Sequence, residues 1–117
     1  MPNTALATKL NDALNRRDRD EIIALFTQDG VFRPSRRASG EARGAEQVAD
    51  KMLTWLSQFA PGSAFAAEHE FYAGDEGYSE WRFTGTDLEG APVDIHGIDY
   101  FRFAGGRIAV KDSFVKF

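Results

Sequence analysis

The chain contains no cysteine and only two histidines among its 117 residues. Without cysteine there is no disulfide, no thiol nucleophile, no cysteine-ligated zinc and no iron–sulfur cluster. Two histidines leave little room for a three-histidine metal site, so we expect no metal and no other cofactor. Positive charge is also scarce, because 14 Lys and Arg against 18 Asp and Glu give a net charge of −4. This balance argues against nucleic acid as a partner, since phosphate binding requires a basic surface.

Long hydrophobic runs are absent as well. No stretch of the sequence approaches the roughly 18 consecutive apolar residues that a membrane-spanning helix needs. The opening Met-Pro-Asn-Thr lacks the pattern of a secretory signal. The length fits one hydrophobic core of about 100–150 residues. We therefore expect a single domain over residues 1–117, soluble and cytoplasmic, with no membrane partner.

The first half of the chain has the hydrophobic periodicity of helices. Apolar residues three and four positions apart predict three helical faces, formed by Leu6, Leu10, Ala13 and Leu14, by Ile22, Leu25 and Phe26, and by Val48, Met52, Leu56 and Phe59. Asp18 and Glu21 have the spacing of a capping box before the second helix. Between the second and third helices we expect a turn at 28–30, a short extended segment at 31–33 and a polar loop over 34–44.

From Phe65 onward apolar and polar residues alternate, which is the period of strands. The pattern predicts four strands at 64–73, 77–86, 92–104 and 107–116, joined by glycine-containing turns. Helices followed by an antiparallel meander define an α+β fold in which the helices pack on one face of the sheet.

The last turn, Gly105-Gly106, suggests a register for the strands on either side of it. A two-residue type I′ turn there pairs Phe103 with Ile108 and Gly97 with Phe114. The same register sets Asp99 directly opposite Asp112 on the apolar face.

Two opposed carboxylates on an apolar face repel each other, and sharing a proton relieves the repulsion. Such a pair is suited to general acid–base chemistry, so Asp99 and Asp112 are candidate catalytic residues. Three alternatives remain open. A bulge near the glycines could shift the register, one aspartate could bond Ser113 or a backbone amide, or a basic side chain could neutralise it.

Alternation places further candidates on the same face. His69 is the third candidate catalytic residue, whereas His96 has the opposite parity. The expected substrate-binding residues are Met52, Phe71, Ser79, Trp81, Phe83 and Phe101. Four arginines form a basic segment that could receive an anionic group or could simply be solvated: Arg33, Arg36, Arg37 and Arg43.

Several segments resemble one protein family. Gly97-Ile-Asp-Tyr-Phe-Arg-Phe103 followed by Gly105-Gly-Arg-Ile108 is similar to the ending of the SnoaL-like, or polyketide cyclase-like, branch of the nuclear transport factor 2-like superfamily. Segments 25–31 and 81–86 resemble the same family. The resemblance implies a cone-shaped, curved antiparallel sheet packed on three N-terminal helices, a fold also described as cystatin-like. It also implies an apolar pocket inside the cone. The family further implies a homodimer, for which we expect the even-numbered faces of the last two strands to form the contact.

The resemblance also bears on function. In the cyclases an aspartate at the position of Asp99 is the acid–base group of an aldol-type ring closure, but their assisting histidine is replaced here by Thr86-Asp87. Ketosteroid isomerases place their base before a proline, where this chain has Arg33. The epoxide hydrolases of the superfamily use an Asp-Arg-Asp arrangement, of which only the two acids can be assigned.

The sequence therefore leaves more than one function open. The chain is either a cofactor-independent acid–base enzyme or a non-catalytic module for ligand binding or dimerisation. The enzyme would be a cyclase, an isomerase or similar to a hydrolase, acting through Asp99 on an apolar or aromatic carbonyl-containing or epoxide substrate. A third alternative is a structural remnant whose own phenylalanines fill the pocket.

Overall fold

The computed structural model describes residues 3–36 and 40–116. Three helices occupy the first half of this part of the chain: α1 (Asn3–Arg16), α2 (Arg19–Leu25) and α3 (Ala45–Leu56). As predicted, α1 buries Leu6, Leu10, Ala13 and Leu14. The Asp18 side chain accepts a hydrogen bond from the Glu21 backbone N–H and thereby caps the start of α2.

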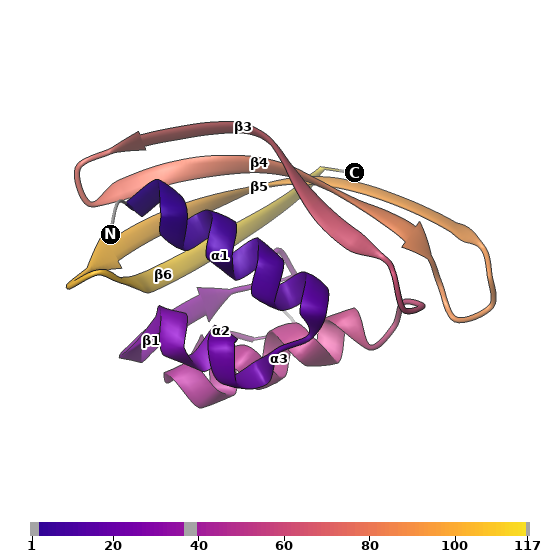
Figure 1. Cartoon of the computed structure of the whole chain (residues 1–117), viewed down its shortest axis with the longest axis horizontal. Helices are drawn as coiled ribbons and strands as arrows, with labels where there is room; N and C mark the ends of the chain where they lie inside the picture. The colour runs from indigo at the N-terminus through magenta and orange to yellow at the C-terminus, as the bar shows by residue number, and fades with distance from the viewer. Residues whose placement is uncertain (1–2, 37–39, 117) are drawn as a thin grey trace.

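The strands form one six-stranded mixed sheet in the order β2-β1-β6-β5-β4-β3. The strands are β1 (Phe26–Arg33), β2 (Ala42–Arg43), β3 (Ala64–Ala73), β4 (Glu76–Thr86), β5 (Pro92–Ala104) and β6 (Arg107–Lys116). All neighbouring strands are antiparallel except β1 and β6, which run parallel. The sheet curves around the helices, and α1 crosses its inner face (Figure 1).

The α+β class and the four long strands are confirmed, with small differences at their ends. The four long strands form the expected antiparallel meander. The expected extended segment at 31–33 is the end of a longer strand, β1, whose parallel pairing with β6 makes the whole sheet mixed and was not predicted. Phe26 belongs to this strand and not to α2, and residues 28–30 lie within the strand and do not form a turn. Part of the expected loop at 34–44 forms β2, while Arg37 lies outside the described residues.

The predicted register between β5 and β6 holds only next to the turn. Phe103 pairs with Ile108 as expected, but Arg102 pairs with Val110, so Ala109 is an extra residue on β6. Beyond this bulge Asp99 lies opposite Ser113 and Gly97 opposite Val115. The bulge avoids two carboxylates on the inner face: Lys111 and Ser113 now face inward with Asp99, and Asp112 faces outward.

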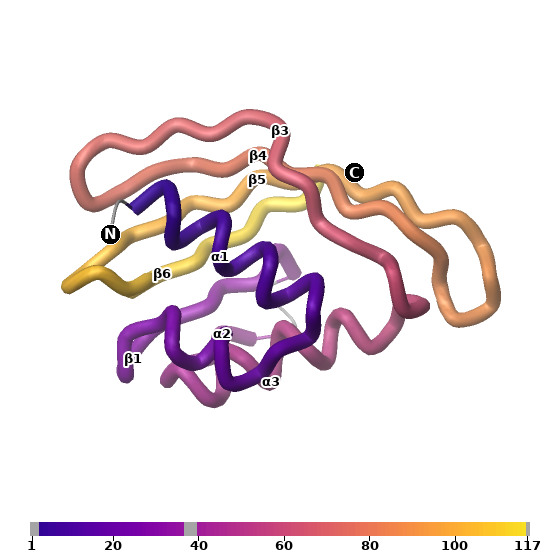
Figure 2. The backbone as a smooth tube through the Cα atoms, viewed as in Figure 1, coloured from indigo at the N-terminus to yellow at the C-terminus, as the bar shows by residue number. Residues whose placement is uncertain are grey.

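A second bulge, in β3, changes another prediction. Ala67 pairs with Trp81, but His69 pairs with Glu80, so Glu68 is the extra residue. Tyr72, and not Phe71, therefore lies on the inner face beyond the bulge. The strand bends sharply in the middle of its length (Figure 2).

Candidate functional site

A cavity of about 410 Å³ lies between the inner face of the sheet and helices α1 and α3. Its walls are mostly apolar and rich in aromatic rings. The lining consists of Leu14, Phe32, Pro34, Ser35, Arg36, Met52, Trp55, Leu56, Phe65, Trp81, Asp94, Ile95, Lys111, Ser113, Val115 and Lys116. A cavity of this size and composition is typical of a small-molecule site. The chain's own phenylalanines therefore do not fill it.

The aromatic part of the wall is held by contacts on both sides. The Trp55 and Phe65 rings stack with centroids 5.9 Å apart, and Phe65 meets the edge of Trp81 at 5.2 Å. The Asn15 side chain fixes Phe65 from α1, because it accepts a hydrogen bond from the Phe65 N–H and donates one to its carbonyl. Gly97 lies opposite Trp81, and a β-carbon there would overlap the indole ring. The glycine therefore allows this ring to lie flat across β5.

Three buried polar side chains meet at the other side of the cavity. Asp99, Lys111 and Ser113 are only 4%, 7% and 7% exposed. The Ser113 hydroxyl donates to Asp99 Oδ1 at 2.7 Å, and Lys111 Nζ donates to Ser113 Oγ at 3.2 Å. Lys111 Nζ also lies 3.4 Å from Asp99 Oδ2 and 4.7 Å from the centroid of the Phe32 ring. Lys111 and Ser113 line the cavity, whereas Asp99 lies behind them.

The polar row continues from Asp99 toward the edge of the sheet. Ser79, which is buried, lies opposite Asp99 on β4. Tyr72 lies close to both, but its hydroxyl makes no hydrogen bond of normal geometry with the described residues. Burial raises the pKa of Tyr72 to about 12, the charges of Glu70 and Asp99 add to the shift, and the Ser79 hydroxyl opposes it. The phenol is therefore neutral at ordinary pH.

The charged residues of the cavity wall differ in their surroundings. Arg36, Asp94 and Lys116 are exposed, whereas Lys111 is buried beside Asp99, Ser113 and the Phe32 ring. The Arg82 guanidinium binds both oxygens of Asp94, at 2.8 and 2.7 Å. These hydrogen bonds hold the pKa of Asp94 below its ordinary value. Asp94 is therefore an ionised carboxylate that already has a cationic partner.

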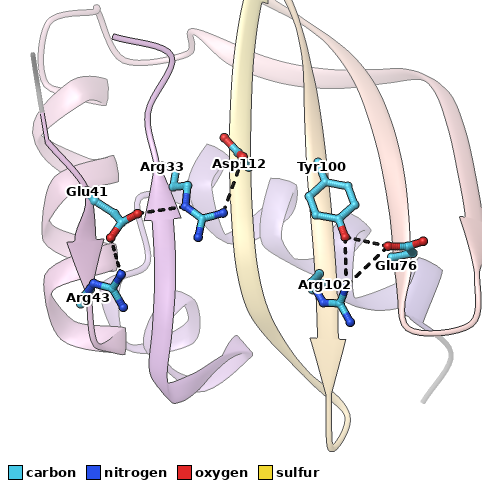
Figure 3. Close-up of polar contacts among 7 residues, drawn as sticks. All are labelled: Arg33, Glu41, Arg43, Glu76, Tyr100, Arg102 and Asp112. Carbon is cyan, nitrogen blue, oxygen red and sulfur yellow. Dashed lines mark hydrogen bonds and ion pairs between the residues drawn. The ribbon is translucent and has the colours of Figure 1, made fainter. Parts of the chain in front are cut away.

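Of the three candidate catalytic residues, the structure brings only Asp99 to the inner face beside the cavity. Asp112 points outward from β6, with its Oδ2 at 3.7 Å from Arg33 Nη1 (Figure 3). His69 is exposed on the outer face of β3. The expected Asp99–Asp112 pair was wrong, and the three alternatives named for it all occur: a bulge shifts the register, Ser113 bonds Asp99, and a basic side chain lies beside it. His96, as predicted, points outward and pairs with Glu68 and Asp94.

The six expected substrate-binding residues divide into three groups. Trp81 and Met52 line the cavity. Phe83, Phe101 and Ser79 are buried on the inner face but belong to the packing around the cavity and not to its lining. The prediction for Phe71 was wrong, because the bulge at Glu68 turns this side chain outward and leaves it 71% exposed.

The sequence argument missed Lys111, Ser113 and Trp55 as parts of the wall. The assumed register turned Lys111 outward. The signal that could have found it is the like-charge pair itself, because two opposed carboxylates on an apolar face favour a shifted register that supplies a cation. Trp55 had no such signal, since it lies beside the main apolar stripe of α3; in the structure it lines the cavity and its ring contacts Phe59 and Phe65.

Other kinds of site were also considered. Among residues 3–36 and 40–116, no three histidine or acidic side chains are grouped as metal ligands. No helix in the described part of the chain combines the length and the apolar character that crossing a membrane requires.

Three helices inside a curved mixed sheet, with a cavity between them, define a fold of the nuclear transport factor 2-like and cystatin-like class. The model of the SnoaL-like domain family matches residues 7–111. The chain therefore belongs to the SnoaL-like domain family, as its sequence suggested. There is no significant match to this sequence among curated proteins.

Solved structures support the same fold. A SnoaL-like polyketide cyclase, so designated, from Jannaschia sp. CCS1 superimposes with a TM-score of 0.80 at 20% identity, over 97% of this chain and 85% of its own. A protein with a ketosteroid isomerase-like fold from Catenulispora acidiphila, in complex with trimethylamine, gives 0.83 at 16% identity, over 93% and 83%. TerC, co-crystallised with polyporic acid, gives 0.84 at 15% identity, over 99% and 92%. At these identities the likeness concerns the fold alone.

Proposed function

We propose that this protein binds an apolar or aromatic small molecule in the cavity between the sheet and helices α1 and α3. The observation that carries the proposal is the cavity itself: about 410 Å³ of space with aromatic walls and a few polar groups gathered at one side. Burial of a flat apolar ligand against these rings supplies the binding free energy, and the polar groups orient it. The structures of TerC with polyporic acid and of the Catenulispora protein with trimethylamine support small-molecule binding by proteins of this fold.

Binding is tested with a neutral aromatic ketone, 2-acetonaphthone, by isothermal titration calorimetry. Val115→Trp adds a bulky ring to the cavity wall, so it should abolish binding. Phe114→Trp is the matched control, because the neighbouring side chain points outward and is 51% exposed. Equal loss of binding in both variants, or no loss in either, would place the ligand elsewhere.

A second candidate function, cofactor-independent acid–base catalysis, is favoured by the hydrogen bond between Ser113 and Asp99. A proton that leaves an acidic C–H of a carbonyl-containing ligand can pass to Ser113 Oγ while the Ser113 hydroxyl proton moves to Asp99 Oδ1, 2.7 Å away. The Lys111 ammonium stabilises the negative charge that develops on the carbonyl oxygen. Asp99 thus acts through Ser113, since it does not itself reach the cavity.

This second function is tested by following deuterium incorporation from D2O into the methyl group of 2-acetonaphthone by NMR. The wild-type chain should accelerate exchange, and Asp99→Asn should remove the acceleration. Asp112→Asn is the matched control because this aspartate points away from the cavity. If Asp99→Asn binds the ketone and changes nothing in the exchange rate, the protein is a binding module without this chemistry.

We also propose a homodimer formed by the outer face of the sheet. Phe71, Tyr78 and Phe114 are 71%, 47% and 51% exposed on this face. Beside them lie Arg33 paired with Asp112 and Glu76 paired with Tyr100 and Arg102 (Figure 3). Apolar side chains flanked by balanced charges suit contact with a second copy of the same surface. Sedimentation should show a dimer that Phe114→Ser dissociates and Leu88→Ser, at the β4–β5 turn, leaves intact.

A further inference from the structure

The cavity wall has more cationic than anionic side chains. Three of the four charged residues that line it are cationic: Arg36, Lys111 and Lys116. The fourth, Asp94, is held on both oxygens by Arg82. Lys116 is paired as well, since its Nζ lies 3.6 Å from Glu80 Oε1, and both Lys116 and Arg36 are exposed. The buried cation of the cavity wall is therefore Lys111.

Of these three cationic side chains, Lys111 is the buried one. Its ammonium group is buried at the cavity wall, where desolvation of a charge is costly. The group has three N–H donors, one of which goes to Ser113 Oγ while Asp99 Oδ2 lies 3.4 Å away. Asp99 lies behind Lys111 and Ser113, and its oxygens face those two side chains. The cavity therefore presents the cation, while the balancing carboxylate is hidden from the ligand.

The aromatic surface lies elsewhere on the wall. Trp55, Phe65 and Trp81 form a continuous set of ring contacts that a flat ligand can cover. The Phe32 ring lies next to the ammonium, with its centroid 4.7 Å from Lys111 Nζ. Because the ammonium is buried, water screens its charge only weakly. The wall thus combines a surface for an aromatic body with a single buried cation for an oxygen-bearing group.

We propose that the ligand is a flat aromatic acid, whose anionic oxygen, a carboxylate or an acidic phenolate, binds Lys111 while its rings cover Trp55, Phe65 and Trp81. The inference rests on the proposed small-molecule function and narrows its ligand class. The same arrangement disfavours amines, because an ammonium group would be placed against Lys111 without a free carboxylate to balance it.

The first experiment compares acids with their uncharged amides by isothermal titration calorimetry at pH 7. The probes are benzoate, 2-naphthoate and biphenyl-4-carboxylate, each paired with its primary amide of nearly the same shape. At least one acid should bind ten or more times more tightly than its amide, because a charge-assisted hydrogen bond is stronger than a neutral one. Equal binding of the acid and amide would overturn the anionic ligand while leaving the proposed function intact.

The second experiment assigns the preference to Lys111. Lys111→Met combined with Asp99→Asn removes both charges of the buried pair, so the variant keeps its fold without an unpaired charge. It should reduce affinity for the preferred acid about tenfold or more and leave the amide within about twofold of wild type. Lys9→Met, the same change on an exposed position of α1, is the control and should alter neither affinity.

The outcomes of the two experiments are distinct. If no acid and no amide binds, the proposed function and this inference both fail. If the acid is preferred and the double variant keeps that preference, the anion binds at another cation and the assignment to Lys111 is wrong. If circular dichroism shows that the double variant does not fold, the same comparison is made with Ser113→Ala. This variant removes one partner of Lys111 and should change the ratio of acid to amide affinity, and an unchanged ratio would overturn the assignment.

Discussion

The central strands β4 and β5 pair with each other in a regular register, whereas the strands that flank them, β3 and β6, each contain a bulge. The β4–β5 pairing runs from Glu76–Arg102 to Thr86–Pro92 without a shift. The β3–β4 and β5–β6 pairings each shift once, at Glu68 and at Ala109. Simple alternation therefore assigned the inward residues of β4 and β5 correctly and failed on the far half of β3 and of β6.

The difference has a physical cause. In β4 and β5, large inward side chains such as Trp81, Phe83 and Phe101 are buried along the strand, and a shift of one residue would expose them. The inward positions of β3 and β6 include small or polar residues, so one extra residue costs little there. On β6 the shift also gives Asp99 a cationic partner. The β6 bulge thus brings Lys111 to the cavity wall, and the β3 bulge turns Tyr72 to the inner face.

The difference between the strands is tested most strongly by deleting one residue from β4, which pairs with β5 without a shift, and one from β6, which contains a bulge. Deletion of Arg82 from β4 should prevent folding, because the residues beyond it would exchange their inward and outward faces. Deletion of Ala109 removes the bulge but keeps Lys111 and Ser113 inward, so the fold should survive with a loss of about 1–3 kcal/mol. Circular dichroism and urea denaturation measure both. If the two deletions lowered the free energy of unfolding equally, β6 would tolerate a change of length at Ala109 no better than β4 does at Arg82.

The next largest effect concerns two ion pairs that involve β6: the buried pair of Lys111 with Asp99 on the inner face, and the exposed pair of Asp112 with Arg33 on the outer face. Lys111→Met leaves Asp99 buried without its cation and should cost about 3–5 kcal/mol in the free energy of unfolding. Arg33→Met breaks the exposed pair with Asp112 and should cost less than about 1 kcal/mol. Adding Asp99→Asn to Lys111→Met should recover most of the loss, as measured by urea denaturation. A cost for Lys111→Met no larger than that for Arg33→Met would contradict the buried pair.

A smaller effect is expected in the unshifted part of the sheet. Gly97→Ala places a β-carbon against the Trp81 ring and should cost about 1–3 kcal/mol through overpacking. In a Trp81→Phe background the shorter ring leaves space, so the same change should cost much less. The double-mutant cycle therefore has a large coupling, and additive costs would mean that the ring does not lie across Gly97.

The smallest effect is a pH dependence on the inner face of β3. Because the pKa of Tyr72 is raised to about 12 in the folded chain from an ordinary value of 10.0, the folded state keeps its proton over a range in which the unfolded state loses it. The associated stability is full below pH 10 and is lost as the pH rises toward 12. Tyr72→Phe should remove this alkaline loss, and Tyr78→Phe, on the outer face, should not. Denaturation midpoints between pH 9 and 12 measure it.

Much of the fold could be predicted from the sequence. The helices follow from the spacing of residues such as Leu6, Leu10 and Leu14, and the four long strands follow from alternation and glycine turns. Only the end of β1, the extended segment at 31–33, was predicted, because the rest of the strand depends on pairing with β6, far along the chain. Of the cavity wall, Trp81 and Met52 were predicted, as was the inward position of Asp99. Lys111 was missed because its position depends on one extra residue, which the repulsion between two opposed carboxylates indicates but alternation alone does not.

The chain's lack of cysteine, its scarcity of histidine and its alternation of phenylalanines were enough to direct attention to carboxylates, above all Asp99, on an apolar face. Those properties are local, and each residue contributes to them independently of the fold. Which carboxylate is buried, and what neutralises it, was decided only by the tertiary structure. The reason is that a single bulge reverses every side chain beyond it, and its cost is set by the helices and strands on which those side chains pack.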